Sequence, residues 1–314
     1  MSGRICIVTG ATSGIGLEIA GILAQKGEQV IGIGRDRERC ARACAEVRAQ
    51  APGAKVTFET ADLSSLAEIR AVARRICRAV DRVDVLVNNA GTFTVRRHVT
   101  PDGLETQLAV NWLAGFALTG LLLRKLCAAP RGRVVTVSSG SHFAGRMHWD
   151  DIQLSRRYNG LKAYDQSKLA TVLFTRELAR RLGASSTVSA YAVDPGLVRT
   201  RIGAKGGGRL VRLVWGIRAR KGIQPRQAAQ AVSYCALDER VEGKSGLYWK
   251  ECAVVQPSCR AADLLDSLRL WELGEVLSGV RYPEAKQMRR QRRVYSTPHM
   301  PDPHLPRSQP HSPV

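Results

Sequence analysis

Short apolar runs and longer amphipathic stretches alternate through most of the chain. The runs are rich in β-branched residues, which favours buried strands. Between them apolar residues recur every three or four positions, as Ile15, Ile19 and Ile22 do, which predicts helices. We expect strands at residues 4–9, 29–33, 55–59, 83–87, 133–137, 188–193 and 246–249. We expect helices at 14–26, from the second strand to about 50, at 64–80, at 104–128 and from 163 onward.

Strands that are apolar along their whole length predict a parallel sheet covered by helices on both faces. Right-handed crossovers then give a doubly wound, Rossmann-type α/β sheet. In such sheets ligands bind at the carboxyl ends of the strands, where the motifs described below fall. We therefore expect one ligand-binding domain over residues 1–287.

The end of the chain has a different composition. Residues 288–314 combine an arginine cluster with prolines between Pro298 and Pro313 and few apolar side chains. Such a segment cannot bury enough surface to fold, which predicts a basic, disordered tail.

The chain carries 48 Lys+Arg against 27 Asp+Glu, a formal net charge of +21. A field of this sign attracts phosphorylated cofactors, acidic lipid or nucleic acid. We expect no nucleic-acid partner, because no basic face interleaved with aromatic residues accompanies the charge.

The segment after Thr200 is basic and apolar, and Gly206–Gly208 gives it a flexible hinge. Its charged residues up to 221 are Arg201, Lys205, Arg209, Arg212, Arg218, Arg220 and Lys221. One interpretation is a lid helix that packs on its own pocket. The alternative is a peripheral contact with an anionic membrane through which an apolar substrate enters.

The eight cysteines show no C-x-x-C spacing and no clustering with histidine, so we expect no metal site. They are typical of small buried residues in a reducing compartment. Because a strand is expected from residue 4, with no apolar run before it, we expect neither a secretory signal nor an N-terminal anchor. The longest apolar stretch, 108–123, is interrupted by Asn111 and is expected to be a buried helix. We therefore expect a cytoplasmic protein. The alternative is peripheral contact with a membrane surface.

The first strand ends in Thr-Gly-Ala-Thr-Ser-Gly-Ile-Gly at residues 9–16, and a helix begins there. Glycines let the backbone approach a pyrophosphate, and the helix N-terminus supplies free N–H groups. The alternative is a tight strand–helix turn without a ligand. The position favours cofactor contacts at Gly10, Ser13, Gly14, Ile15 and Gly16.

Arg35 follows the second strand, where an arginine suits the 2′-phosphate of NADP(H) and an acidic residue would suit NAD. The alternative is a set of solvated charges that opens the next helix. After the third strand, Asp62 and Leu63 are candidates for the adenine contact, although Asp62 could equally start a helix. Asn89 and Gly91 end the fourth strand in Asn-Asn-Ala-Gly and can tie the strands to the cofactor loop.

The candidate catalytic residues are Asn111, Ser139, Tyr164 and Lys168. A tyrosine hydroxyl can exchange a proton with a substrate oxygen, but its free pKa of ~10 is high for a base, and a nearby ammonium lowers it. A serine hydroxyl can stabilise developing charge on the carbonyl oxygen. A buried asparagine can hold a water that links the lysine to solvent.

Tyr-x-x-x-Lys occurs twice, at Tyr158–Lys162 and at Tyr164–Lys168. We choose Tyr164, because Gly160 interrupts the first copy and is expected to precede the stable helix. Tyr158 is then expected to be a loop aromatic over the site entrance.

Taken together, these motifs resemble the short-chain dehydrogenase/reductase family over residues 4–271. Residues 9–16 and 88–91 match its T-G-x-x-x-G-x-G and N-N-A-G motifs, and the catalytic residues follow in the family's order. Residues 134–139 and 163–170 are similar to the retinol dehydrogenase-like branch. The resemblance implies NADP(H), an apolar carbonyl or alcohol substrate, and a homo-oligomer. It also implies that residues 1–287 form a catalytic domain with a substrate lid at about 197–224.

The same resemblance implies that Tyr164 and Lys168 also hold the cofactor ribose, and that Pro195 and Thr200 contact the nicotinamide amide. The alternative function is a non-catalytic NADP-binding sensor or scaffold.

Overall fold

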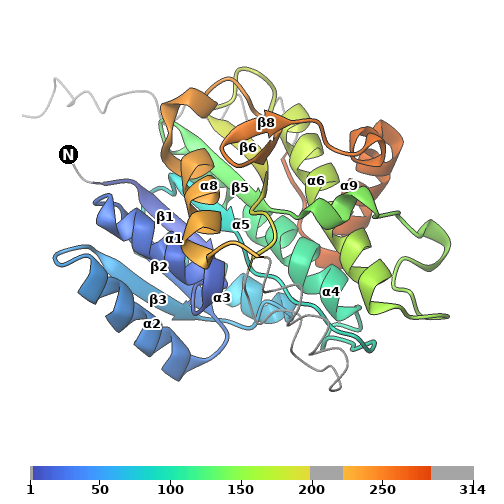
Figure 1. Cartoon of the computed structure of the whole chain (residues 1–314), viewed down its shortest axis with the longest axis horizontal. Coiled ribbons are helices and arrows are strands. Elements are labelled where there is room, and N and C mark those ends of the chain that lie inside the picture. The colour runs from blue at the N-terminus through green and yellow to red at the C-terminus, as the bar shows by residue number, and fades with distance from the viewer. Residues whose placement is uncertain (1–2, 199–221, 284–314) are drawn as a thin grey trace, which may run out of the picture.

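A single eight-stranded sheet organises the computed structural model, in which residues 3–198 and 222–283 are described (Figure 1). The strand order is β3-β2-β1-β4-β5-β6-β7-β8. All neighbours pair in parallel except β7 and β8, which are antiparallel. The strands are β1 (Ile5–Thr9), β2 (Gln29–Gly34), β3 (Val56–Thr60), β4 (Val85–Asn88), β5 (Gly132–Val137), β6 (Val188–Asp194), β7 (Tyr248–Lys250) and β8 (Ala253–Val255). The predicted doubly wound Rossmann-type sheet is confirmed.

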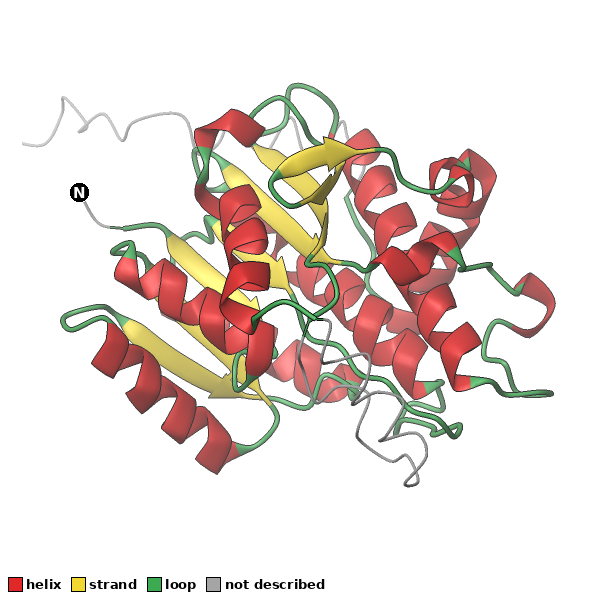
Figure 2. Cartoon of the chain, viewed as in Figure 1, coloured by secondary structure: helices red, strands yellow, loops and turns green. Residues whose placement is uncertain are grey.

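Helices cover both faces of the sheet (Figure 2). One layer holds α1 (Gly14–Gln25), α2 (Arg37–Gln50) and α8 (Pro225–Leu237). The other holds α3 (Leu66–Ala79), α5 (Ala114–Cys127) and α6 (Gly160–Leu182), with α9 (Leu264–Ser278) packed outside α6 and α5. The remaining elements are α4 (Thr106–Leu108), a π-helical turn (Ala109–Leu113) and 3₁₀ turns at Gly140–Phe143, Trp149–Asp151, Glu239–Val241 and Cys259–Ala262.

Alternate residues of each central strand serve the two layers. In β1, Ile7 joins the core under α3, α5 and α6, whereas Cys6 and Val8 join the core under α1 and α8. This division explains why the strands are apolar along their whole length.

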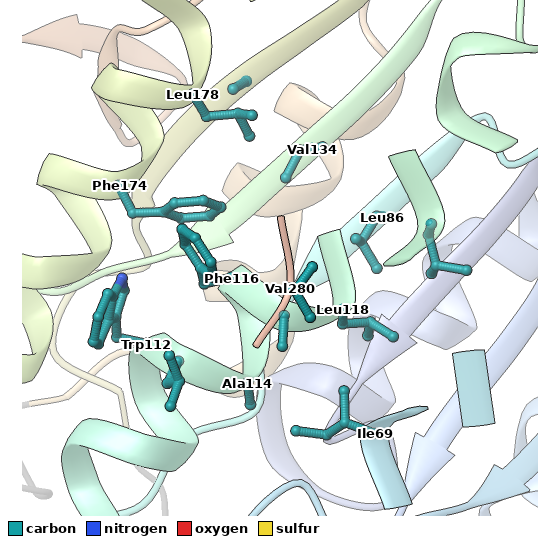
Figure 3. Close-up of a cluster of buried hydrophobic side chains, with 14 of the residues drawn as sticks. Ile69, Leu86, Trp112, Ala114, Phe116, Leu118, Val134, Phe174, Leu178 and Val280 are labelled. Atoms are coloured by element: carbon teal, nitrogen blue, oxygen red, sulfur yellow. The ribbon is translucent and has the colours of Figure 1, made fainter. Parts of the chain in front are cut away.

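Phe116 on α5 lies at the centre of the larger core (Figure 3). Its ring contacts four other aromatic rings, with centroid distances of 5.0 to 6.1 Å. The partners are Trp112, Phe174, Trp271 and Tyr282. Such pairs contribute about 0.5–1.5 kcal/mol each beyond their buried area, so this cluster fixes α9 against α5 and α6.

The apolar helix predicted at 104–128 is confirmed but is not uniform. It runs as α4, the π-helical turn and α5, and Asn111 stands in the wide turn. The segment Thr106–Cys127 is long and apolar enough to cross a membrane, but most of it is buried inside the protein, as a core helix is.

Several expectations need correction. Helix α6 begins at Gly160, not at 163, because the Asn159 side chain caps it by accepting from the N–H groups of Leu161 and Lys162. Cys252 and Cys259 are exposed, so the buried setting expected for the cysteines is wrong for these two. The pattern also missed α8, α9 and β8, whose strand is only Ala253–Val255. Thr200, most of the predicted lid and the tail lie outside the described residues.

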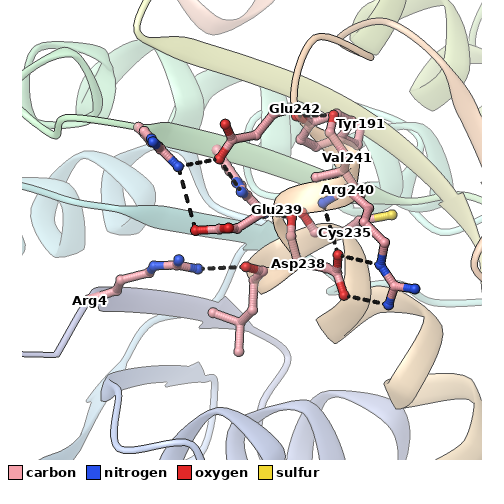
Figure 4. A network of polar contacts seen from close by, with 11 residues as sticks. Arg4, Tyr191, Cys235, Asp238, Glu239, Arg240, Val241 and Glu242 are labelled. Carbon is pink, nitrogen blue, oxygen red and sulfur yellow. Dashed lines mark hydrogen bonds and ion pairs between the residues drawn. The ribbon is translucent and has the colours of Figure 1, made fainter.

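A polar network lies at the amino end of the sheet, where β5 begins (Figure 4). The buried Arg133 donates to the carbonyls of Cys235 and Asp238 and pairs with Glu242 at 3.4 Å. These carbonyls end α8, so the guanidinium caps the helix C-terminus. Arg4 binds the carbonyl of Leu237 in the same way, at 2.9 Å.

Candidate active site

In the turn after β1, glycines allow a ligand to come close to the backbone N–H groups. Gly10 and Gly14 adopt φ values of +66° and +57°, which favour glycine. Ser13 precedes α1 with no side-chain hydrogen bond to the helix, and no acidic residue lies in the first turn. The first N–H groups of α1 therefore have neither a capping oxygen nor a side-chain anion nearby, which suits a phosphate.

Asn89 ties this turn to the end of β4. Its Nδ2 donates to the Thr9 carbonyl at 2.8 Å, and its backbone N–H donates to Thr9 Oγ1 at 2.9 Å. A side chain at Gly16 would collide with Asn89 Nδ2 and with the Gly10 carbonyl. The glycine turn is thus a packed unit that a Cβ would fill, and its residues fit a pyrophosphate.

Arg35 is exposed at the carboxyl end of β2, directly before Asp36. Asp36 is the N-cap of α2 and accepts from the Arg39 N–H at 2.8 Å. Its carboxylate serves the helix start, while Arg35 is exposed to solvent.

Asp62 and Leu63 follow β3, as expected. Asp62 Oδ1 accepts from the Ser64 N–H at 2.9 Å, so this carboxylate does organise the chain before α3. Leu63 is buried and, with Asn111 and Ala90, lines a small cavity that also touches Thr9 at the end of β1.

Ser139 and Tyr164 lie close together across the carboxyl edge of the sheet. Ser139 caps the 3₁₀ turn after β5 and accepts from the Ser141 N–H at 3.2 Å. Burial raises the pKa of Tyr164 to about 12, so the lowering expected from a nearby ammonium is not seen, and the side-chain hydrogen bond with Ser139 only partly opposes the rise. The two hydroxyls therefore share one site, where both can reach a substrate oxygen.

Lys168 lies one helical turn after Tyr164 on α6 and is buried. Its Nζ donates to the Val137 carbonyl at 3.1 Å and lies 5.7 Å from the centroid of the Tyr164 ring. Burial lowers the pKa of Lys168 to about 8, and the charge of Asp194 opposes this shift. Lys168 therefore loses its proton at a lower pH than a free lysine does.

Asn111 is oriented by three hydrogen bonds. Its Oδ1 accepts from the Thr92 N–H at 2.7 Å, and its Nδ2 donates to the Thr92 carbonyl at 3.0 Å and to Ser167 Oγ at 2.9 Å. A Cβ on Gly91 would lie 3.5 Å from Asn111 Oδ1 and 3.8 Å from Lys168 Nζ. Gly91 thus marks the point where the asparagine and the lysine meet, and π-helical turns like the one holding Asn111 are frequent at functional sites.

Tyr158, of the second Tyr-x-x-x-Lys copy, does not join this group. It precedes α6, and its hydroxyl lies 2.8 Å from Gln107 Nε2 and donates to Glu105 at 3.0 Å. These contacts hold the loop before α6 to α4. Tyr158 therefore has a structural role, unlike Tyr164.

Sequence reasoning missed two residues of the site. The ring of Phe93 packs edge-on against Tyr164, and Asp194 is a buried carboxylate at the end of β6. Phe93 comes shortly after the Asn-Asn-Ala-Gly motif, but nothing in the pattern pairs it with position 164. Asp194 directly precedes Pro195, and its Oδ1 accepts from the Gly196 N–H at 2.9 Å. Pro195 lies in this turn, whereas Thr200 is outside the described residues.

Comparison with known proteins places this geometry in context. The family model described as short chain dehydrogenase matches residues 4–207. Mouse retinol dehydrogenase 12 is 38% identical over 280 residues, which cover 89% of this chain and 88% of that protein. Mouse retinol dehydrogenase 13 is 39% identical over 287 residues, covering 88% and 84%.

Solved structures share the architecture. An uncharacterized protein from Mycobacterium paratuberculosis is 34% identical with a TM-score of 0.72, covering 89% of this chain and 95% of that chain. A short chain dehydrogenase from Shigella flexneri, complexed with NADP, has a TM-score of 0.64 and covers 81% and 98%. At 23% identity it shows the shared fold alone.

Proposed function

Since the chain belongs to the short-chain dehydrogenase family, in its retinol dehydrogenase-like branch, we propose that it moves a hydride between NADP(H) and the carbonyl or alcohol group of an apolar substrate. The observation that carries this proposal is the convergence of Ser139, Tyr164, Lys168 and Asn111 at the carboxyl edge of the sheet.

Each of the four residues has a defined task in this proposal. The Ser139 hydroxyl hydrogen-bonds the substrate oxygen, where negative charge develops. Tyr164 gives its phenolic proton to that oxygen during reduction and takes one during oxidation. Lys168, as an ammonium, stabilises the phenolate, and Asn111 holds the path by which the lysine recovers a proton.

NADP(H) is the proposed cofactor, and it supplies the hydride donor or acceptor when bound. The uncapped start of α1 would receive the pyrophosphate, and Arg35 would pair with the 2′-phosphate. The use of Asp36 as a helix cap supports this choice, because its Oδ1 is already bonded to the Arg39 N–H.

The proposed substrate is apolar, since the related retinol dehydrogenases are named for an apolar alcohol. A panel of retinal, a steroid ketone and medium-chain aldehydes, each run with NADPH and with NADH, would identify the class. Peripheral membrane contact through residues 199–221 remains a prediction, because that segment is outside the described residues.

The chain provides its own matched control for the test of catalysis. Oxidation of NADPH with the carbonyl panel is measured for the native protein, Tyr164→Phe and Tyr158→Phe. We expect Tyr164→Phe to lose at least ~100-fold in kcat, since general acid catalysis contributes roughly 10²–10⁴-fold. Tyr158→Phe should stay near the native rate, because its hydroxyl binds Glu105 and Gln107. Equal, measurable rates for the native protein and Tyr164→Phe would refute the role of Tyr164. No turnover by the native protein with any substrate would favour a non-catalytic NADP-binding protein.

A further inference from the structure

His142 is fully buried three residues after Ser139, in the 3₁₀ turn that the catalytic serine caps. Its Nδ1 lies 2.9 Å from the Ser139 carbonyl oxygen. Its Nε2 accepts from the backbone N–H of Ser258 at 3.1 Å. One imidazole therefore joins the serine turn to the segment before α9, a distance of 116 residues in sequence.

These two partners allow only one protonation state. A carbonyl oxygen only accepts, so Nδ1 must carry a proton. A backbone N–H only donates, so Nε2 must be unprotonated. The ring is thus the neutral Nδ1–H tautomer, and a second proton on Nε2 would point at the Ser258 N–H.

Packing fixes the ring plane as well. The imidazole lies 4.7 Å from the Tyr248 ring of β7 and 4.2 Å from the Phe143 ring, measured between centroids. Burial lowers the pKa of His142, while the hydrogen bond to Ser139 and the charge of Asp194 oppose the shift. Other ionisable groups around the turn are Tyr164 and Lys168 on α6 and Arg260, which donates to the Gly145 carbonyl at 3.2 Å.

We propose that His142 is a positioning residue for the reaction: its neutral ring holds the Ser139 peptide in place and anchors the serine turn to Ser258. This inference rests on the proposed function, since it assigns a role relative to the catalytic serine. It predicts that the two nitrogens have separable effects. Nδ1 orients Ser139, and Nε2 holds the link to the C-terminal segment.

Two conservative variants separate these effects. In His142→Asn, the side-chain amide stands near the Nδ1 position, so a donor to the Ser139 carbonyl is kept and the acceptor for Ser258 is lost. In His142→Gln, the amide stands near the Nε2 position, so an acceptor for Ser258 is kept and the donor to Ser139 is lost. We expect His142→Gln to lose about tenfold in kcat, as for one lost hydrogen bond in a transition state. His142→Asn should keep kcat within about threefold and raise KM instead.

The protonation state is read without any activity assay. Imidazole ¹⁵N spectra of the native protein identify the His142 signal as the one missing in His142→Gln. We expect the Nδ1–H tautomer at pH 8. Reduction with NADPH, in which Tyr164 acts as the acid, should fall in the native protein but not in His142→Gln when the pH drops into the range where His142 gains a proton, which lies below that of a free imidazole.

The outcomes are distinct. An Nε2–H tautomer, or an equal loss of kcat in both variants with unchanged KM, would overturn the positioning role and leave His142 as core packing only. If the native protein turns over no carbonyl substrate at all, the proposed function fails, whereas the ¹⁵N spectra still decide whether the clamp between Ser139 and Ser258 exists.

Discussion

Phe93 holds the ring of Tyr164 edge-on, with the ring centroids 5.7 Å apart and the planes at 75°. Edge-to-face pairs are specific in geometry, so this contact restricts where the phenol can point. Since Phe93 is buried, it also supports the loop after Gly91.

Phe93→Ala should therefore lower both stability and turnover. We expect a loss of about 3 kcal/mol in the free energy of unfolding and about tenfold in kcat, with Phe93→Leu milder in both. Urea denaturation and steady-state kinetics measure the two effects. Leu265→Ala is the stability control, since Leu265 is 77% exposed. A Phe93→Ala protein with native kcat would show that the ring contact does not orient Tyr164.

The lowered pKa of Lys168 predicts a pH-dependent stability in the cofactor-free protein. The lysine titrates at about 8 in the fold and at 10.5 in the unfolded chain, so the unfolded state binds more protons between these values. Stability should rise with pH across that window, by about 3 kcal/mol relative to Lys168→Met. The two proteins are compared by the difference between their urea midpoints from pH 7.5 to 10.5. The titration of the tyrosines and cysteines, which both proteins share, cancels in this difference. A constant difference would contradict the buried ammonium.

Gly16→Ala should weaken cofactor binding, because its Cβ would collide with Asn89 Nδ2 and the Gly10 carbonyl. Moving these groups opens the packed turn, and we expect at least a tenfold loss in NADPH affinity, which corresponds to ~1.4 kcal/mol. NADPH fluorescence titration measures it. Gly21→Ala, on the same helix, meets only the flexible end of Gln50 and should bind normally. Equal affinities in the two variants would refute the close-approach role of Gly16.

Arg35→Ala should reduce the preference for NADPH over NADH. Loss of a charge-assisted contact to a phosphate is expected to raise the KM for NADPH by about tenfold and to leave that for NADH unchanged. Arg42→Ala is the control, since Arg42 pairs with Glu38 on the exposed face of α2. A similar change for both cofactors would mean that Arg35 does not read the 2′-phosphate.

Arg133→Met should cost stability without affecting catalysis. The guanidinium is 3% exposed and bonds the carbonyls that end α8, at the sheet edge opposite Ser139. Leaving those partners unpaired should reduce the free energy of unfolding by about 3 kcal/mol, while kcat stays native. Arg131→Met, at an exposed ion pair, should cost less than about 0.5 kcal/mol. A changed kcat would mean that the two edges are coupled.

The sequence was most informative about features that depend on neighbouring residues in the chain. Continuous apolar strands predicted the parallel sheet, and glycine spacing predicted the turn after β1, because both depend on local geometry. The choice of Tyr164 over Tyr158 agrees with the contacts of each, although Gly160 starts α6 instead of preceding it.

Other features depend on contacts between distant segments. His142 meets Ser258, and Phe93 meets Tyr164, and no periodicity links these positions. The π-helical turn at Ala109–Leu113 also has no pattern of its own, because the apolar residues continue through it. Tertiary packing decides these features, and only the structure reveals them.

The wide turn around Asn111 makes the length of this segment matter as much as its composition. A π-helical turn holds one residue more than the α-helix on either side, and each residue of an α-helix advances by about 100°. Deleting any one residue there would straighten the helix and rotate everything beyond it. Either Asn111 would leave Thr92 or Phe116 would leave its ring partners. A designer who transplants this helix into another scaffold must therefore carry the surplus residue along, whatever side chain it bears.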